Sequence, residues 1–81
     1  MDLNETVEMM QSPDYKERFK AEYYQLKIRH EKLETMLVKY ADGTLEFKPT
    51  CPYDLLASQW NIMGAYLNVL RARADVEGVE L

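Results

Sequence analysis

The sequence predicts an all-α fold: an antiparallel hairpin of two long helices with a short helix before it. Two observations favour this fold. Apolar residues recur at steps of three and four over two long stretches, and the stretch from 15 to 41 contains neither proline nor glycine. Helix start and stop signals stand at the ends of both stretches. The predicted organisation is a helix or arm over 1–11, a hairpin over 12–78 and a tail over 79–81.

The first segment, residues 1–11, carries a weak helical pattern. Leu3, Val7 and Met10 share one face, and Asp2 followed by Glu5 is typical of a capping box. A helix this short is marginal in isolation, so it either docks on the main body or stays a partly ordered arm.

The first long helix is predicted over about 13–42. Ser12 is the expected cap, Pro13 suits the first turn, and Asp14 lies beside the positive end of the helix dipole. Gly43 is the expected stop, because it adopts the left-handed conformation without strain. One face forms a seam for a second helix: Phe19, Tyr23, Leu26, His30, Leu33, Leu37 and Tyr40.

The connector, residues 43–51, is expected to be a short extended piece that lays Leu45 and Phe47 over the end of the helices. The second long helix is then predicted over about 52–77, with Pro52 at its first position, Thr50 or Cys51 as cap and Gly78 after its end. Gly64 inside this helix indicates a close approach to its neighbour.

The second long helix is apolar on two neighbouring stripes, which together are wider than one partner helix covers. In an antiparallel hairpin whose facing residue numbers sum to about 92, the second stripe meets the first long helix and the first stripe stays uncovered. We therefore expect the first stripe to be the interface of a homo-oligomer, formed by Leu56, Trp60, Met63, Leu67 and Leu70. The first stripe is Leu56, Trp60, Met63, Leu67, Leu70 and Ala74, and the second stripe is Leu55, Ile62, Tyr66, Val69 and Val76, interrupted by Gln59 and Arg73.

Composition narrows the function classes. The 81 residues make one small domain, with a formal net charge of −4, one cysteine and one histidine. The negative net charge argues against binding to a long nucleic acid and against a polybasic contact with a membrane. With one cysteine and one histidine, no internal disulfide and no Cys/His zinc site can form. No apolar run is long enough for a bilayer and the acidic N-terminus is unlike an export signal, so we expect a cytoplasmic protein.

No catalytic motif, cofactor motif or metal-ligand pattern occurs. His30 is expected to be a core histidine bonded across the hairpin to Gln59, and it lies about 16 Å along the helix from the connector, too far to act as a base for Cys51. Glu17, Glu31 and Glu34 have the spacing of surface ion pairs with lysines. We therefore do not expect an enzyme.

Aromatic and basic residues gather where the first long helix begins and the second ends. Tyrosine rings can stack on a base, and cations can bind phosphate through charge-assisted hydrogen bonds. A second group, Lys48, Thr50 and Trp60, lies near the connector. The alternative interpretation of both groups is scaffold, with Arg73 paired to Glu22. The predicted ligand residues are Tyr23, Tyr24, Lys27, Arg29, Arg71 and Arg73.

A resemblance rests on two spaced patterns that cover about 15–76. The patterns are Glu22-x3-Leu26-x2-Arg29-x3-Leu33-x2-Met36-Leu37 and Leu55-Leu56-x2-Gln59-x3-Met63-x2-Tyr66-x2-Val69-Leu70-x2-Arg73. In these patterns the chain resembles small helical-hairpin proteins of crAss-like and other gut phages. Those proteins are distantly similar to the hairpin domain of phage sponges that sequester cyclic nucleotide signals of CBASS and Thoeris immunity.

The resemblance implies a symmetric homo-oligomer, a hexamer or another even assembly, in the cytoplasm of an infected bacterium. It implies a cyclic oligonucleotide or cyclic ADP-ribose-type ligand between subunits, held by stacking and by cations, and not hydrolysed. Arg29, Gln59, Tyr66 and Arg73 match the phage pattern, whereas Tyr23, Tyr24, Lys27 and Arg71 are chosen from local chemistry. The alternative function is an inhibitor of protein–protein interaction, or a phage accessory protein, that docks through its helical surface.

Overall fold

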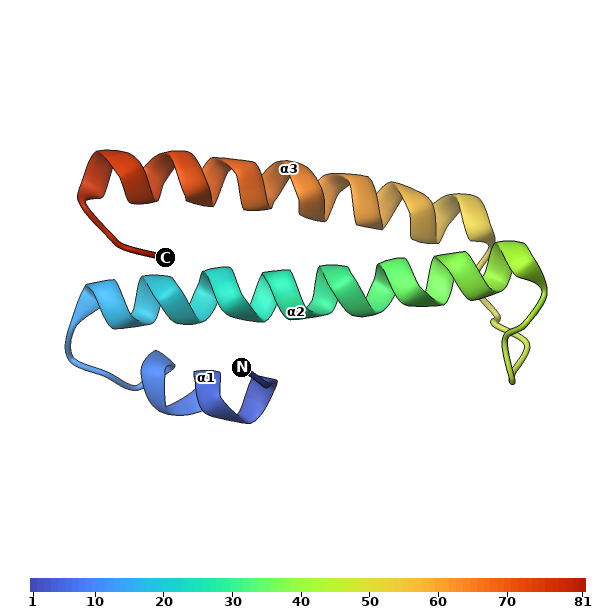
Figure 1. Ribbon diagram of the computed structural model, residues 1–81, viewed down its shortest axis with the longest axis horizontal. Helices are drawn as coiled ribbons and strands as arrows, with labels where there is room; N and C mark the ends of the chain where they lie inside the picture. The colour runs from blue at the N-terminus through green and yellow to red at the C-terminus, as the bar shows by residue number, and fades with distance from the viewer.

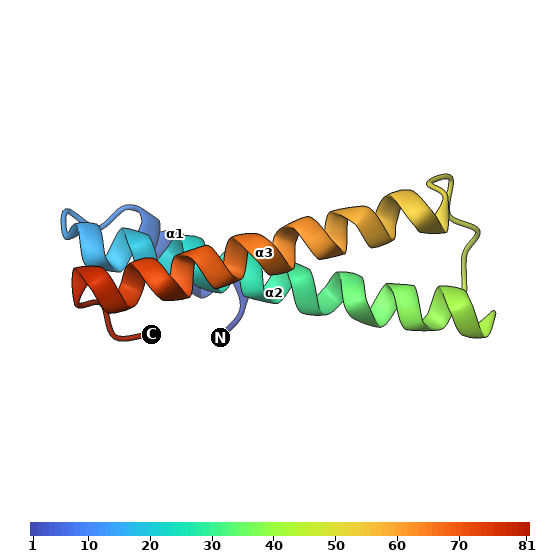
Figure 2. The same ribbon diagram turned by 90° about the horizontal axis from the view of Figure 1, so that it is seen from above.

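Three helices and no strand form the molecule, which is described for all of residues 1–81 by a computed structural model. The helices are α1 (Leu3–Met10), α2 (Tyr15–Asp42) and α3 (Tyr53–Glu77). The two long helices lie side by side in opposite directions, and α1 packs against the first half of α2 (Figure 1). Seen from above, α3 crosses α2 at an angle (Figure 2), and the molecule measures 43 × 24 × 16 Å. The prediction of an all-α fold is confirmed.

The short helix α1 is docked, which decides between the two interpretations of residues 1–11. The Asp2 carboxylate accepts a hydrogen bond of 3.0 Å from the backbone N–H of Glu5, as a capping residue does. Thr6 is fully buried, and its hydroxyl accepts a 2.9 Å hydrogen bond from Nε2 of Gln25 on α2. This polar contact fixes α1 against α2.

Two helix starts differ from the prediction. The N-cap of α2 is Asp14, whose carboxylate accepts from the N–H of Lys16 at 2.9 Å, while the Ser12 hydroxyl accepts from the N–H of Asp14. Pro52 is the N-cap of α3 instead of its first residue, and no side chain caps this end. Both predictions were one or two residues too early, because several adjacent residues have capping ability and only the backbone path selects one.

Both predicted glycine stops are confirmed. Gly43 and Gly78 have φ angles of 73° and 69°, in the left-handed region that favours glycine. The connector contains turns and bends but no extended strand, and Phe47 is 59% exposed, so the prediction that Phe47 covers the helix ends was wrong. After Gly78 the tail folds back, and Val79 is buried with its N–H bonded to the carbonyl of Ala74 at 2.9 Å.

The hydrophobic core lies at the open end of the molecule, where α2 begins and α3 ends. Its members come from α2, α3 and the tail, and Leu26 packs against them. Leu70 is the most deeply buried, with 1% of its surface exposed. The core residues are Phe19, Tyr23, Leu67, Leu70, Ala74 and Val79.

The two stripes of α3 face the opposite way to the prediction. In the first stripe, expected to be uncovered, Leu67 and Leu70 are buried, and Leu56, Trp60 and Met63 are partly buried. The second stripe is exposed along its length. The physical reason lies in the second stripe's polar members: burying the Arg73 guanidinium in an apolar contact would cost much more than burying Ala74 of the first stripe.

Contacts between α2 and α3 nevertheless pair residue numbers that sum to between 88 and 94, close to the predicted 92. The Arg73 guanidinium lies 4.9 Å from the centre of the Phe19 ring, the His30 and Trp60 rings stack at 4.7 Å, and Tyr40 meets the edge of Tyr53. A Cβ at Gly64 would lie 3.4 Å from Nε2 of His30, an ordinary van der Waals contact, so the approach of the two helices there is not close enough to require glycine.

Candidate functional site

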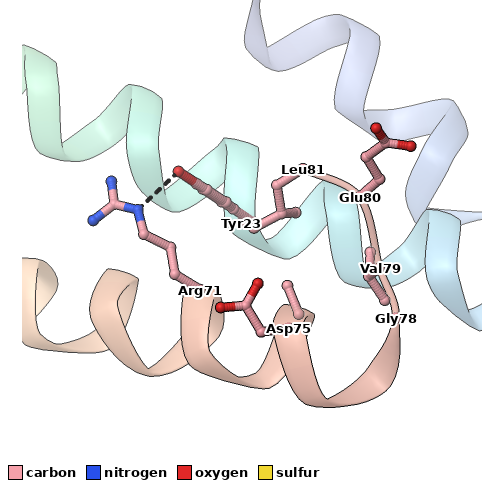
Figure 3. Close-up of a pocket in the computed structure, with 8 residues that line it drawn as sticks. Tyr23, Arg71, Asp75, Gly78, Val79, Glu80 and Leu81 are labelled. Atoms are coloured by element: carbon pink, nitrogen blue, oxygen red, sulfur yellow. Dashed lines mark hydrogen bonds between the residues drawn. The ribbon is translucent and has the colours of Figure 1, made fainter.

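The largest surface hollow is at the open end, beside the core. It has a volume of about 620 Å³ and lies between α2, the end of α3 and the returning tail. In Figure 3 the tail runs from Gly78 past Val79 and Glu80, and Leu81 lies beside the Tyr23 ring. The helix stop at Gly78 creates this hollow, because it turns the chain back toward α2. We call it the open-end hollow; its lining is Tyr23, Arg71, Ala74, Asp75, Gly78, Val79, Glu80 and Leu81.

Arg71 is held at one side of the open-end hollow by two hydrogen bonds. Its Nε donates to the Tyr23 hydroxyl at 3.2 Å, the dashed line in Figure 3, and its Nη1 donates to Oδ1 of Asn68 at 3.1 Å. The guanidinium carbon is 5.6 Å from the centre of the Tyr23 ring. Because these bonds occupy only part of its five N–H donors, Arg71 can still bind an anion.

Tyr23 and Tyr24 form a parallel stack, with ring centres 5.2 Å apart and an angle of 5° between the planes. Tyr23 lines the open-end hollow, and Tyr24 lines a smaller hollow of about 150 Å³ together with Lys27. The tyrosine pair therefore lies between the two hollows, with Arg71 in the hollow of Tyr23 and Lys27 in the hollow of Tyr24. Because Tyr23 is only 6% exposed and stacks on Tyr24, the ring that a planar ligand can contact is the partly exposed Tyr24, with Arg71 and Lys27 as the two sites for anionic groups.

Two carboxylates, Asp75 and Glu80, also line the open-end hollow. Carboxylates accept hydrogen bonds from hydroxyl and amino groups and repel phosphate. A matching ligand would place its anionic groups toward Arg71 and its hydroxyl or amino groups toward Asp75 and Glu80.

Arg73 and Arg29 do not reach the tyrosine pair. Arg73 lies over the Phe19 ring and donates to the Glu77 carboxylate at 2.9 Å, a bond that raises the pKa of the guanidinium above its ordinary value. Arg29 is exposed and makes no salt bridge or side-chain hydrogen bond. Of the six predicted ligand residues, the structure brings together Tyr23, Tyr24, Lys27 and Arg71.

The tail and the last turn of α3 contribute residues to the hollow that no sequence pattern predicts. Asp75 and Glu80 belong to no motif, and residues 79–81 are predicted only as a tail. Gly78 was a usable signal, because a left-handed residue after a helix reverses the chain and returns the next side chain to the helix.

His30 is bonded across the two long helices, but its partner differs from the prediction. Its Nε2 is 3.1 Å from the backbone carbonyl of Trp60, not the Gln59 side chain. The indole Nε1 of Trp60 is buried without a hydrogen-bond partner. Cys51 lies in another hollow with Leu55 and Ile62, which His30 does not line. His30 therefore serves the packing of α2 against α3.

No group of three or more His, Cys, Asp or Glu side chains is placed to hold a metal ion. None of the three helices is long and apolar enough to cross a membrane.

Comparison with known proteins supplies the family. The Sequestin family model matches residues 13–76, which is most of the chain and includes α2 and nearly all of α3. The chain belongs to the Sequestin family. The family's name suggests sequestration of some molecule. No curated protein and no solved structure is detectably similar to the chain.

Proposed function

We propose that this chain is a phage-encoded anti-defence protein that binds a cyclic nucleotide signal of bacterial immunity in the host cytoplasm. It keeps the signal from its receptor and does not cleave it. The ligand is a cyclic oligonucleotide or a cyclic ADP-ribose-type molecule, bound by a homo-oligomer that is a hexamer or another even assembly. Membership of the Sequestin family supports sequestration, and the contents of the hollow support the ligand class.

One observation carries the choice of ligand: the stacked Tyr23–Tyr24 pair with Arg71 bonded to its edge. A cyclic nucleotide has a planar base for the aromatic surface, phosphates for Arg71 and Lys27, and hydroxyl or amino groups for the two carboxylates. Binding without cleavage needs only these contacts.

A ligand panel tests the proposal. Cyclic dinucleotides, cyclic trinucleotides and cyclic ADP-ribose isomers are added one at a time, and the unfolding temperature is measured. At least one ligand should raise it, and heat denaturation should release that ligand with unchanged mass. Arg71→Ala should abolish the shift, whereas Lys32→Ala, which removes an exposed cation elsewhere on α2, should preserve it. A cleaved product, or a shift that survives Arg71→Ala, would contradict the proposal.

The alternative function is inhibition of a protein–protein interaction, or a phage accessory role, and the exposed second stripe of α3 favours it. The two functions separate in infected cells. If the chain docks on a protein, Ile62→Lys should abolish its effect and Arg71→Ala should not. Sequestration of a ligand predicts that Arg71→Ala abolishes the effect.

A further inference from the structure

The second stripe of α3 is the largest set of exposed apolar residues on one helix face. Leu55 is 61% exposed, Ile62 70%, Val69 56% and Val76 88%, with Tyr66 between them at 43%. Neither α1 nor the tail covers these residues, since both pack elsewhere. A monomer rarely leaves a row of this length in water.

The total surface of the chain is also large for its mass. It measures 5777 Å² for 9.6 kDa, whereas a folded monomer of this size typically exposes about 5,100 Å². The excess of about 700 Å² is close to the roughly 800 Å² that each partner contributes to a standard interface. The area that needs covering therefore matches one partner of ordinary size.

The spacing of the second stripe is self-complementary, and this indicates which partner. When a second α3 is laid antiparallel about the midpoint between Ala65 and Tyr66, Leu55 faces the partner's Val76 and Ile62 faces the partner's Val69. The two Tyr66 side chains then meet at the centre. In such a contact, if residue i of one copy meets residue j of the other, then residue j of the first copy meets residue i of the second, as a two-fold axis requires.

Charge selects the antiparallel direction. In a parallel pair, Arg73 within the stripe would face the partner's Arg73, and like charges in contact are unfavourable. In the antiparallel pair the partner's Arg73 faces Ser58, and the two guanidinium groups are about 22 Å apart along the axis. The antiparallel pair therefore avoids repulsion between the two Arg73 side chains.

The surface shape agrees with this register. A hollow of about 420 Å³ lies beside Leu55, Ile62 and Met63, and most of its exposed lining is apolar. The antiparallel register places the partner's Val69 and Val76 over this hollow, so two valines enter from the second copy. By symmetry, each copy both supplies and receives them.

We propose that two copies of the chain associate through the second stripes of α3, packed antiparallel across a two-fold axis near Tyr66, as the unit from which an even assembly is built. The inference rests on the self-association in the proposed function but not on the ligand. Arg71 is about 200° round the helix from Val69, so the open-end hollow faces away from this contact and stays accessible.

Light scattering at tens of micromolar protein tests the contact. The unaltered chain should have the mass of a dimer or a multiple of it, and Ile62→Lys should reduce that mass at unchanged helix content. Asn68→Lys, an equal change at an exposed position on the Arg71 side of α3, should leave the mass unaltered. A monomeric unaltered chain, or an Ile62→Lys variant with undiminished mass, overturns the inference and leaves the stripe to a different protein.

Cysteine cross-linking in a Cys51→Ser background tests the direction. Tyr66→Cys should form a disulfide between copies, and Leu55→Cys mixed with Val76→Cys should cross-link the two variants to each other. Val76→Cys alone should stay unlinked, and its self-linkage would indicate a parallel pair and overturn the inference. A dimer that binds no ligand contradicts the proposed ligand and leaves this inference standing, whereas a monomer that binds ligand contradicts this inference and the proposed self-association and leaves the ligand standing.

Discussion

The two ends of the long helices are held together by different means. At the open end, Phe19, Tyr23, Leu70 and Val79 are among six residues of a buried core, and α1 packs against the opposite side of α2 (Figure 1). In the half near the connector, Leu37 is the one buried residue, and Leu56, Trp60 and Met63 are partly exposed. Packing is therefore concentrated where no covalent link joins α2 to α3.

This difference has a simple physical origin. The short connector keeps its end of α2 close to α3, so little further contact is needed there. The other ends of α2 and α3 separate unless packing holds them, because ordering the chain costs about 1–2 kcal/mol per residue. The hollow that carries the candidate site lies at this packed end, which gives Arg71 and Tyr23 a rigid frame.

The largest expected difference between the two ends is in the free energy of unfolding lost by two leucine truncations. Leu70→Ala should lower the free energy of unfolding by about 3 kcal/mol, because it empties a fully buried position. Leu56→Ala, the same change at a partly exposed position near the connector, should cost about 1 kcal/mol. Urea unfolding followed by circular dichroism measures both. Equal costs would show that the two ends contribute alike.

The contact between α1 and α2 gives the next largest effect. Thr6→Val keeps the side-chain shape but removes the hydroxyl that accepts from Gln25, so stability should fall by about 1–2 kcal/mol. Amide hydrogen exchange should become faster in α1 while the middle of α3 is unchanged. Asn4→Ala, at an exposed position of α1, is the matched control. Unaltered exchange in the Thr6→Val variant would mean that this bond does not hold α1.

Two glycine substitutions should have opposite signs. Gly64→Ala should stabilise by up to about 1 kcal/mol, because alanine favours the helix and its methyl group reaches only an ordinary contact of 3.4 Å with His30. Gly78→Ala should destabilise by about 1 kcal/mol, because the left-handed φ of 69° strains any side chain. Thermal unfolding measures both, and a destabilised Gly64→Ala variant would mean that the helices cannot yield even slightly at His30.

The smallest expected effect concerns Tyr66, whose hydroxyl donates a hydrogen bond to the Glu22 carboxylate on α2. Because this bond is exposed to water, Tyr66→Phe should cost only about 0.5 kcal/mol. Tyr53→Phe, which removes a hydroxyl without a hydrogen-bond partner, should cost less still. Chemical denaturation at low protein concentration measures the free energy of unfolding of both variants. A decrease above about 2 kcal/mol for Tyr66→Phe would mean that this hydrogen bond contributes a major part of the stability.

Much of the fold follows from local signals in the sequence. Gly43, Gly78 and the capping residue Asp2 mark helix ends through backbone geometry, which depends only on near neighbours. The orientation of α3 could not be obtained in this way. Its two stripes are both apolar, and the choice between them depends on where Arg73 and Ala74 end up after the helices pack.

The candidate site also follows from the sequence only where near neighbours and helical spacing decide which residues meet. The facing residues of α2 and α3 bring Arg71 to Tyr23, and helical spacing places Lys27 near Tyr24. Asp75 and Glu80 were missed because they join the hollow only when the tail turns back after Gly78. Arg73 is two residues from Arg71 and so lies on the other side of the helix, away from the tyrosine pair.

The stacked rings of His30 and Trp60 provide the protein with an optical reporter. They are the chain's single histidine and single tryptophan, so the indole emission comes from one known place. Separating α2 from α3 removes the imidazole from the indole and changes that emission, with no added label. Fluorescence can therefore follow opening of the long helices at their middle, even while circular dichroism shows both still helical.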